Sequence, residues 1–439
     1  MTAPRAGPAP QPAVGAAGLL WTDRWYLLAA CAALAVVVDP LDLRLAAIPV
    51  IKHLALALAL PACVLTVLGY RLRRPLPAAV RYRKVLSVFL PLLSLAAFVL
   101  AGSLYARAVE GIQNTFLNVG LYMLAAPLAC AMVLHARAPE RLVRGYVHII
   151  LAGAVVMSVA LVVNFGVRQV YHEQIFLVVP LAVLFLSGPK PTMLRWAAGA
   201  WFLAMAWFSA KYTSYLIAGL TAGYLFVAVL IPRLARRPAR ERAAWVYWAG
   251  LIAIAGAALL AFIASRGSYR LPTGNVEFRL HTYSAAWERF LDSPLWGTAF
   301  AVEAVEKFTP YAIGIARNVL PTHSDVLDIV ANGGLIAAGL CVWALVALFR
   351  RARAGPLAPA QLDDSWSPCA HTLAVIAAAG GATAAFNPIL LQPSMAYLIW
   401  TSLGLLTGLA LRLPAPRGAG AEHPALSTKG RTAPTSVGA

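Results

Sequence analysis

Apolar runs of about 20 residues alternate with short polar connections along most of the chain. A run of that length matches the hydrocarbon core of a bilayer, so each one predicts a membrane-spanning helix. The predicted spans cover residues 20–38, 46–70, 85–103, 117–135, 146–164, 174–188, 194–209, 214–232, 245–264, 326–349, 370–387 and 394–411. The pattern therefore predicts an all-α, polytopic membrane protein with about 12 transmembrane helices, an even number that puts both termini on one side.

The composition agrees with this prediction. Of the 439 residues, 61% are hydrophobic and only 12% are charged, whereas soluble domains carry about 25% charged residues. An ordinary cytosolic enzyme is thereby excluded. Glycine and proline, at 32 and 30 residues, show no collagen-like period, which also excludes a fibrous architecture.

The formal net charge of +19 would suggest nucleic-acid binding in a soluble protein. With cytoplasmic termini, however, the inner segments hold 25 Lys and Arg against 6 acidic residues, and the outer segments hold 11 of each. The whole excess then lies on the cytoplasmic face, as the positive-inside rule requires. The charge therefore predicts orientation in a multi-pass membrane, with lipids and not nucleic acid as partners.

The chain divides into five parts. Residues 1–18 do not show the charged region, apolar region and cleavage site of a signal peptide in that sequence. We expect them to form a disordered cytoplasmic N-terminus. Residues 19–264 hold the first nine spans, residues 265–325 a long outer connection, and residues 326–412 the last three spans. Residues 413–439 are expected to form a disordered cytoplasmic tail. Connections as long as the outer one are uncommon and tend to be functional.

Within the long connection, residues 279–292 follow helical spacing. Trp287 and Leu291 belong to a largely apolar face, and Arg279 is among the charged residues that surround it. Such a helix would lie on the membrane surface or cap the bundle. The pattern also favours a second short helix over residues 300–308.

The sequence Pro-Thr-His-Ser-Asp at residues 321–325 precedes the tenth span. Thr322 and Asp325 have the spacing of a capping box, which predicts Thr322 as the N-cap and puts His323 in the first turn at the outer face. The helix dipole there favours an anion and disfavours protonated imidazole, so His323 could act as a general base. Alternatively, His323 is an interfacial histidine that hydrogen-bonds a carbonyl.

Basic residues also occur at outer helix ends, where cations are disfavoured. Arg168 follows the fifth span, Lys211 lies between the seventh and eighth, and Arg266 follows the ninth. These cations could neutralise a diphosphate whose lipid tail stays in the bilayer, or they could snorkel to lipid headgroups. Glu173 could orient an acceptor or balance Arg168.

Metal binding has little support in the sequence. No HExxH or CxxC spacing occurs, and the outer segments contain no DxD-like carboxylate pair. The five cysteines lie in or beside apolar runs, which favours packing roles. We therefore predict neither a metal nor another cofactor.

Two blocks, RLHTYSAAWERFLDSPLWGTAF from Arg279 and THSDVLDIVANGGLIAAGL from Thr322, resemble the paired signature of the O-antigen ligase and O-antigen polymerase superfamily. That signature joins an Arg-led amphipathic helix, ending in Pro-hydrophobic-hydrophobic-Gly, to a His-led helix with a Gly two turns on. The number of spans and the late position of the long connection also fit. The two blocks cover about a tenth of the chain.

The resemblance implies a GT-C-like, metal-independent, inverting glycosyltransferase of the bacterial inner membrane. Such enzymes take a glycan from undecaprenyl diphosphate at the periplasmic face and transfer it to a lipid A-core sugar hydroxyl in ligases, or to the growing chain in polymerases. The family histidine corresponds to His323 and the loop arginine to Arg279, and basic residues of earlier loops correspond to Arg168 and Lys211.

The chain departs from the family at two positions. Ser324 stands where many members have Asn, and Lys211 stands where they have Arg. Lysine supplies a positive charge but cannot form the bidentate contact that a guanidinium group makes. A ligase is the first hypothesis and a polymerase the second. A protein acceptor is disfavoured because protein-directed members carry an extra C-terminal region. A secondary transporter is a more distant alternative, since it would show two related halves and midplane charges.

Overall fold

The computed structural model describes residues 19–39, 43, 45–73, 82–110, 116–163, 174–188, 192–209, 212–235, 273–301, 322, 324–354, 357 and 366–412. All regular structure within these ranges is helical. Its α-helices are α1 (Trp21–Val38), α2 (Pro49–Arg73), α3 (Tyr82–Glu110), α4 (Phe116–Met123), α5 (Ala125–His135), α6 (Pro139–Val163), α7 (Ile175–Val178), α8 (Leu181–Leu186), α9 (Met193–Ser209), α10 (Tyr212–Tyr224), α11 (Ile231–Ala235), α13 (Thr273–Asp292), α14 (Asp325–Ala354), α15 (Ser367–Ala384) and α16 (Pro393–Arg412). The predicted all-α class is confirmed for this part of the chain.

Eight helical segments of the described residues are long and apolar enough to cross a membrane. They are Trp21–Val38, Pro49–Gly69, Val85–Ala106, Phe116–His135, Pro139–Val163, Thr213–Ala235, Asp325–Ala352 and Pro393–Arg412. All eight coincide with predicted spans. Their length and composition support a multi-pass membrane protein.

The other four predicted spans have different outcomes. Residues 174–188 form two short helices, α7 and α8, with a turn at Pro180 between them. Pro180 cannot donate a helical hydrogen bond, which is compatible with the interruption. The seventh and eleventh predicted spans correspond to α9 and α15, which are helices of 17 and 18 residues outside the group of eight. Residues 245–264 lie outside the described part of the chain.

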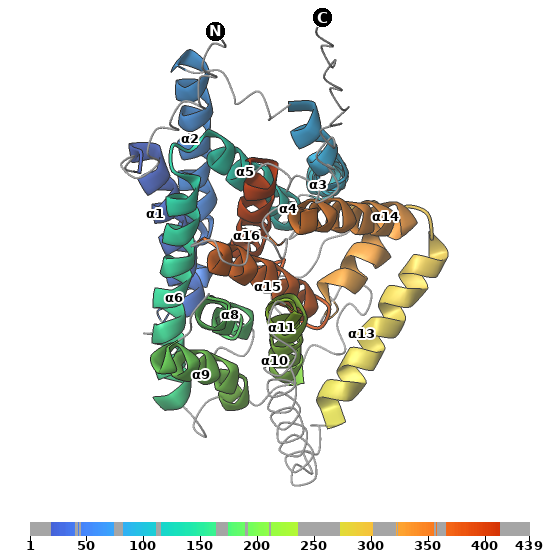
Figure 1. Ribbon diagram of the computed structural model, residues 1–439. Helices are drawn as coiled ribbons and strands as arrows, with labels where there is room; N and C mark the ends of the chain where they lie inside the picture. Colours follow the sequence, from blue (N-terminus) through green and yellow to red (C-terminus); the bar gives the residue numbers. More distant parts are fainter. Residues whose placement is uncertain are drawn as a thin grey trace, which may run out of the picture.

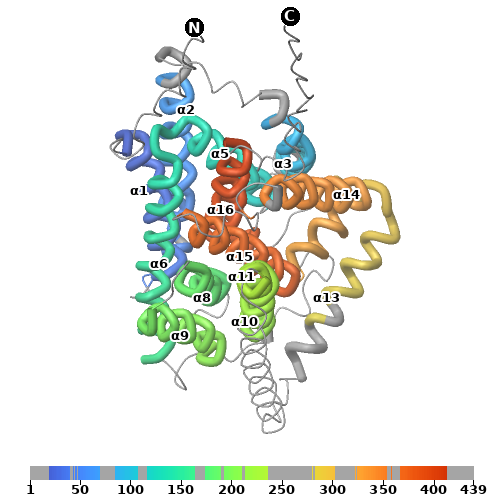
Figure 2. Tube along the Cα trace, in the orientation of Figure 1, coloured from blue at the N-terminus to red at the C-terminus, as the bar shows by residue number. Residues whose placement is uncertain are grey.

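α16 lies at the centre of the bundle, against α5 and α15 (Figure 1; Figure 2). In its apolar window, 94% of the residues are buried. Gly404 and Gly408 sit one turn apart on the face toward α5, where a side chain on Gly404 would meet the Ala126 carbonyl and one on Gly408 would meet Val133. Small residues at this spacing let two membrane helices approach closely.

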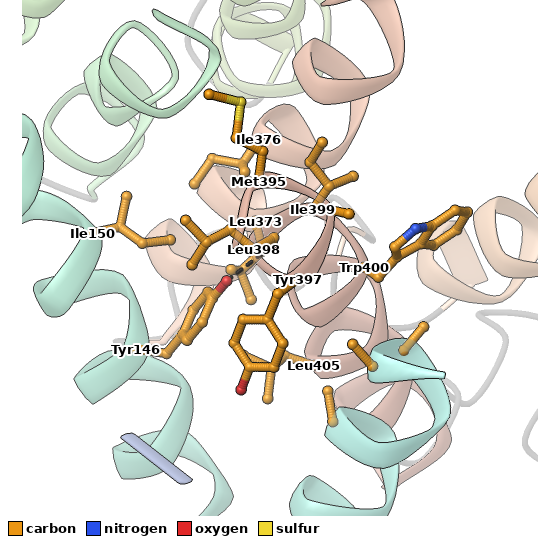
Figure 3. Close-up of a cluster of buried hydrophobic side chains, with 14 of the residues drawn as sticks. Tyr146, Ile150, Leu373, Ile376, Met395, Tyr397, Leu398, Ile399, Trp400 and Leu405 are labelled. Carbon is orange, nitrogen blue, oxygen red and sulfur yellow. Dashed lines mark hydrogen bonds between the residues drawn. The ribbon is translucent and has the colours of Figure 1, made fainter. Parts of the chain in front are cut away.

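A buried hydrogen-bond group joins α6 to α16 (Figure 3). The Tyr146 hydroxyl donates to the Leu398 carbonyl at 2.9 Å, and the Ser402 hydroxyl donates to the same carbonyl at 2.8 Å. Tyr146 and the neighbouring Tyr397 are fully buried among apolar side chains. Because these hydroxyls are inaccessible to water, the hydrogen bonds fix the relative position of the two helices.

Two arginines satisfy carbonyl groups at helix C-termini. Arg412, at the end of α16, donates from Nη1 to the carbonyls of Val133 and Ala136 at 2.9 and 2.6 Å, at the end of α5. Arg233 of α11 donates from Nη2 to the carbonyl of Gly188 at 2.7 Å, just beyond α8. These carbonyls have no partner within their own helices, so the guanidinium groups replace the missing donors.

Gly404→Leu is expected to destabilise the protein by about 1–3 kcal/mol, because the new side chain would have to displace the α5 backbone. Gly219→Leu is the matched control, since Gly219 in α10 has no neighbouring atom within 4 Å of an added Cβ. Thermal unfolding of both variants in mild detergent measures the difference. Equal Tm values would contradict the close contact between α5 and α16.

Candidate functional site at the α13–α14 junction

α14 is broken at Gly334, within the first half of the helix. This residue has φ 58° and ψ −159°, a conformation that is essentially restricted to glycine. The helix continues in a different direction beyond it, so that α14 is drawn as two segments at an angle (Figure 1). The break leaves backbone groups without their usual helical partners.

The loop over residues 293–301, which follows α13, supplies these partners. The N–H of Leu335 donates to the Pro294 carbonyl at 2.8 Å, and the N–H of Ile336 donates to the Leu295 carbonyl at 3.1 Å. The backbone carbonyls of the loop therefore replace the missing acceptors of the helix. A broken helix in an apolar segment is tolerated only when its freed groups are satisfied in this way.

Bonds in the opposite direction complete the junction. The N–H of Phe300 donates to the Asn332 carbonyl at 3.0 Å, and the Thr298 hydroxyl donates to Asn332 Oδ1 at 3.1 Å. The fully buried Phe300 ring makes edge contacts with Phe98 of α3 and Phe116 of α4. The loop is thus bound to α14 by its backbone and to the bundle by an aromatic side chain.

The two chain segments approach so closely that glycine is needed on both sides. Gly297 has φ 59°, and an added Cβ would lie 2.6 Å from the backbone of Asn332. At Gly334 an added Cβ would lie 2.5 Å from the backbone of Leu295. The two sequence blocks that carry the family resemblance therefore pack backbone to backbone.

The start of α14 differs from the prediction. The helix begins at Asp325, and Ser324 is the N-cap because its hydroxyl oxygen accepts the N–H of Leu327 at 3.2 Å. The prediction of Thr322 as N-cap is wrong by two residues. Thr322 instead donates its hydroxyl to the Ser324 carbonyl at 2.7 Å, which closes a turn before the helix. His323 lies outside the described residues.

Two buried carboxylates of α14 hold neighbouring parts of the chain. Asp328 Oδ1 accepts the N–H of Thr322 at 3.0 Å, and Asp325 Oδ2 accepts the N–H of Leu390, between α15 and α16, at 2.7 Å. In the predicted capping box Asp325 would have accepted the N–H of Thr322. Asp328 takes this bond because the helix starts later, and Asp325 is then free to hold Leu390.

α13 packs against α14 through a small, partly polar face. Thr282 and Ala286 are buried, whereas Trp287 and Leu291 on the other side are 55% and 54% exposed. The amphipathic helix predicted from the sequence is present, and its large apolar side chains point away from the bundle. This arrangement suits a helix whose outer side contacts lipid at the membrane surface.

Arg279 lies three residues before Thr282, on the same side of α13, and is partly buried. Its Nε atom is buried and has no hydrogen-bond partner among the described residues. Buried donors are normally paired, so an unpaired guanidinium N–H is unusual. Arg279 is the predicted diphosphate ligand that falls in the described part of the chain.

Arg289 of α13 donates from Nε to the Ala285 carbonyl at 3.4 Å and lies near Asp328 of α14. Burial lowers the pKa of the Arg289 guanidinium, and the nearby Asp328 carboxylate opposes that shift. Asp328 Oδ2 is buried without a hydrogen-bond partner in the described residues. Asp328 was not predicted as a site residue, although an acidic residue one turn inside an apolar span was a usable signal.

The remaining predicted site residues, Arg168, Glu173, Lys211, Arg266 and His323, lie outside the described part of the chain. Their roles stay predictions. The structure packs α13, the helix that carries Arg279, against α14. The predicted short helix over residues 300–308 also falls almost entirely on residues that are not described.

Comparison with protein-family models finds no match for this chain, and comparison with curated proteins also finds none. Within the described ranges, no group of three or more His, Cys, Asp or Glu side chains is arranged to hold a metal ion. A functional assignment therefore depends on the geometry of the α13–α14 junction and on the resemblance of the two sequence blocks.

Gly334→Ala is expected to destabilise the junction by about 1–3 kcal/mol, because alanine avoids this backbone conformation and its Cβ would overlap the loop. Gly339→Ala, five residues later in the same helix, is the control, since Gly339 has open space around it. Thermal unfolding and protease sensitivity between residues 293 and 301 report the effect. Wild-type behaviour of Gly334→Ala would show that the break is not required.

Proposed function

We propose that this chain is an O-antigen ligase of the bacterial inner membrane. It transfers a glycan from undecaprenyl diphosphate to a sugar hydroxyl of the lipid A core at the periplasmic face. The observation that carries the proposal is the junction itself: the Arg-led block and the His-led block of the family signature are interlocked through backbone hydrogen bonds. Two motifs that act on one substrate must be held together in this way.

The reaction needs stabilisation of the leaving diphosphate and removal of a proton from the acceptor hydroxyl. The acceptor oxygen bonds to the anomeric carbon while the bond from that carbon to the diphosphate oxygen breaks, with inversion, and the diphosphate leaves with the electron pair. Arg279, supported by Arg168, Lys211 and Arg266, stabilises the negative charge of the leaving group. His323 accepts the proton of the acceptor hydroxyl, and Glu173 orients the acceptor. Side chains carry all of these roles in the proposal, without a metal or cofactor.

Contacts between helix ends support the predicted alternation of the spans. Predicted outer ends meet one another: His53 Nδ1 of α2 lies 3.0 Å from the Tyr122 hydroxyl of α4, and Asp325 binds Leu390. A predicted inner end behaves likewise, since Arg412 of α16 caps α5. A chain with alternating spans requires such pairing of ends.

A polymerase of the same superfamily is the alternative, because the acceptor cannot be read from the donor site. Complementation of ligase-deficient and polymerase-deficient bacteria, followed by lipopolysaccharide gels, separates the two. A ligase restores polymer on the core and removes carrier-linked polymer. A polymerase extends a core that bears a single repeat unit. Failure of both would overturn the glycosyltransferase proposal.

A secondary transporter fits the described helices less well. Transporters use helix breaks to expose backbone groups to substrate near the membrane midplane. In α14, the freed N–H groups of Leu335 and Ile336 are bound to the loop instead. The break therefore serves internal packing.

His323→Ala is expected to lower glycan transfer by about 100-fold or more through loss of the general base. His148→Ala is the matched control, because His148 is an exposed histidine of α6 at the predicted opposite face. Transfer is measured with purified proteins of equal Tm. Full activity of His323→Ala would remove His323 from the mechanism.

Arg279→Lys is expected to reduce transfer by about 10- to 100-fold, since lysine keeps the charge but cannot form a bidentate contact with the diphosphate. Arg350→Lys serves as control, since Arg350 is exposed at the far end of α14. Initial rates at varied donor concentration locate the loss in donor binding or in turnover. If Arg279→Lys transfers at the wild-type rate, Arg279 does not hold the diphosphate through a fork.

A further inference from the structure

Helices α1 and α6 lie side by side in the bundle (Figure 1). An added Cβ on Gly145 of α6 would meet the side chain of Leu27 in α1, and an added Cβ on Gly153 would meet Leu34, two turns further along both helices. The two helices therefore run in the same direction. Their N-termini lie at one end of the bundle, the predicted cytoplasmic end, where the positive ends of both helix dipoles favour an anion.

Exposed arginines occupy these two helix starts. Arg24 lies one turn before Leu27 in α1 and is exposed. Arg141, which is also exposed, lies one turn before Gly145 in α6. Because Leu27 and Gly145 pack together, Arg24 and Arg141 sit at the same level on neighbouring helices. A ligand at this level can therefore be bound by side chains from both helices.

Positive charge dominates this surface. Arg137, just before α6, is exposed and lies near Asp23 of α1, on which it acts electrostatically. The first turns of α1 and α6 each hold one acidic residue, Asp23 and Glu140. Asp23 is buried, and its Oδ2 atom accepts the N–H of Leu20 at 2.9 Å, while Glu140 is half-buried. The exposed charged side chains described at these helix starts are therefore basic.

Two tryptophans flank Arg24 on α1. Trp21 and Trp25 are 58% and 37% exposed, and their ring centroids lie 5.0 Å apart. In membrane proteins, exposed tryptophans collect at the level of the lipid headgroups. The arginines beside these rings are thus placed at the depth of the lipid phosphate groups.

We propose that this surface, the α1–α6 basic surface, binds the headgroup of an anionic phospholipid of the cytoplasmic leaflet. It consists of Trp21, Arg24, Trp25, Arg137 and Arg141. The guanidinium groups of the two helices bind the phosphate oxygens, whose geometry their planar fork matches, and the tryptophan rings pack on the glycerol and upper acyl chains. Basic surfaces between membrane helices on the cytoplasmic side are suited to lipids of this class. The inference does not depend on the proposed glycosyl transfer.

The experiment titrates the purified protein in mild detergent with cardiolipin, an anionic phospholipid with two phosphate groups. Native mass spectrometry measures the binding, and thermal unfolding measures the Tm. Cardiolipin is expected to bind and to raise the Tm, because a ligand of the folded state stabilises it. Phosphatidylcholine, which has no net charge, and inorganic phosphate, which has no acyl chains, are expected to leave the Tm unchanged.

Two double variants then test the surface itself. Arg24→Gln with Arg141→Gln is expected to weaken cardiolipin binding at least about 10-fold, since each arginine near the headgroups adds to the attraction. Arg195→Gln with Arg350→Gln is the matched control, because it removes the same charge from exposed positions on α9 and α14. The control is expected to bind cardiolipin like the wild type. All four substituted residues are exposed, so the Tm without lipid is expected to stay at the wild-type value.

Equal losses of cardiolipin binding in the two double variants would overturn the inference, because the attraction would then follow net charge alone. Equal stabilisation by phosphatidylcholine or by inorganic phosphate would also overturn it. Arg24→Lys with Arg141→Lys adds a further measure: lysine keeps the charge at both positions and is expected to retain most of the affinity. A loss as large as that of the glutamine variant would contradict the electrostatic basis of the surface.

Discussion

The backbone hydrogen bonds between the loop over residues 293–301 and the break in α14 hold the candidate site together. A helix interrupted within an apolar segment has N–H and carbonyl groups that lipid cannot satisfy, and each unpaired group costs several kcal/mol. Here the loop supplies the missing groups. Neither segment can leave the other without exposing those groups, so α13, which continues directly into the loop, is fixed relative to α14.

This constraint also explains the unusual composition of α13. A surface helix of a soluble protein turns its apolar side inward, whereas α13 turns Thr282 and Ala286 inward and leaves Trp287 outside. Arg289, on the same helix, lies near the buried carboxylate of Asp328. A basic and small inner face with an aromatic outer face suits a helix between a polar reaction site and lipid.

The sequence predicts those features that depend on local pattern. Apolar runs located the eight long apolar helices because hydrophobic length is a local property. The pairing of the two blocks was anticipated only through a resemblance, since contacts between residues 294 and 335 depend on tertiary packing.

The N-cap was misplaced by two residues because Thr322, Ser324 and Asp325 all suit a helix start. In the structure Asp328 accepts the N–H of Thr322, six residues earlier, and this hydrogen bond holds Thr322 in the turn before the helix. Asp328 itself was missed because an isolated acid in an apolar run carries no sign of its partner. The break between α7 and α8 could not be predicted from Pro180 alone, because Pro61 and Pro91 lie inside the continuous helices α2 and α3.

The arginine caps of Arg233 and Arg412 have a consequence for biogenesis. Both residues belong to segments that the charge distribution predicts to be cytoplasmic, and both complete the carbonyl ends of neighbouring helices. A helix inserted the wrong way round would carry its arginine to the opposite leaflet and leave the α8 or α5 terminus unsatisfied. Correct insertion and correct helix assembly would thus be coupled through the same guanidinium groups.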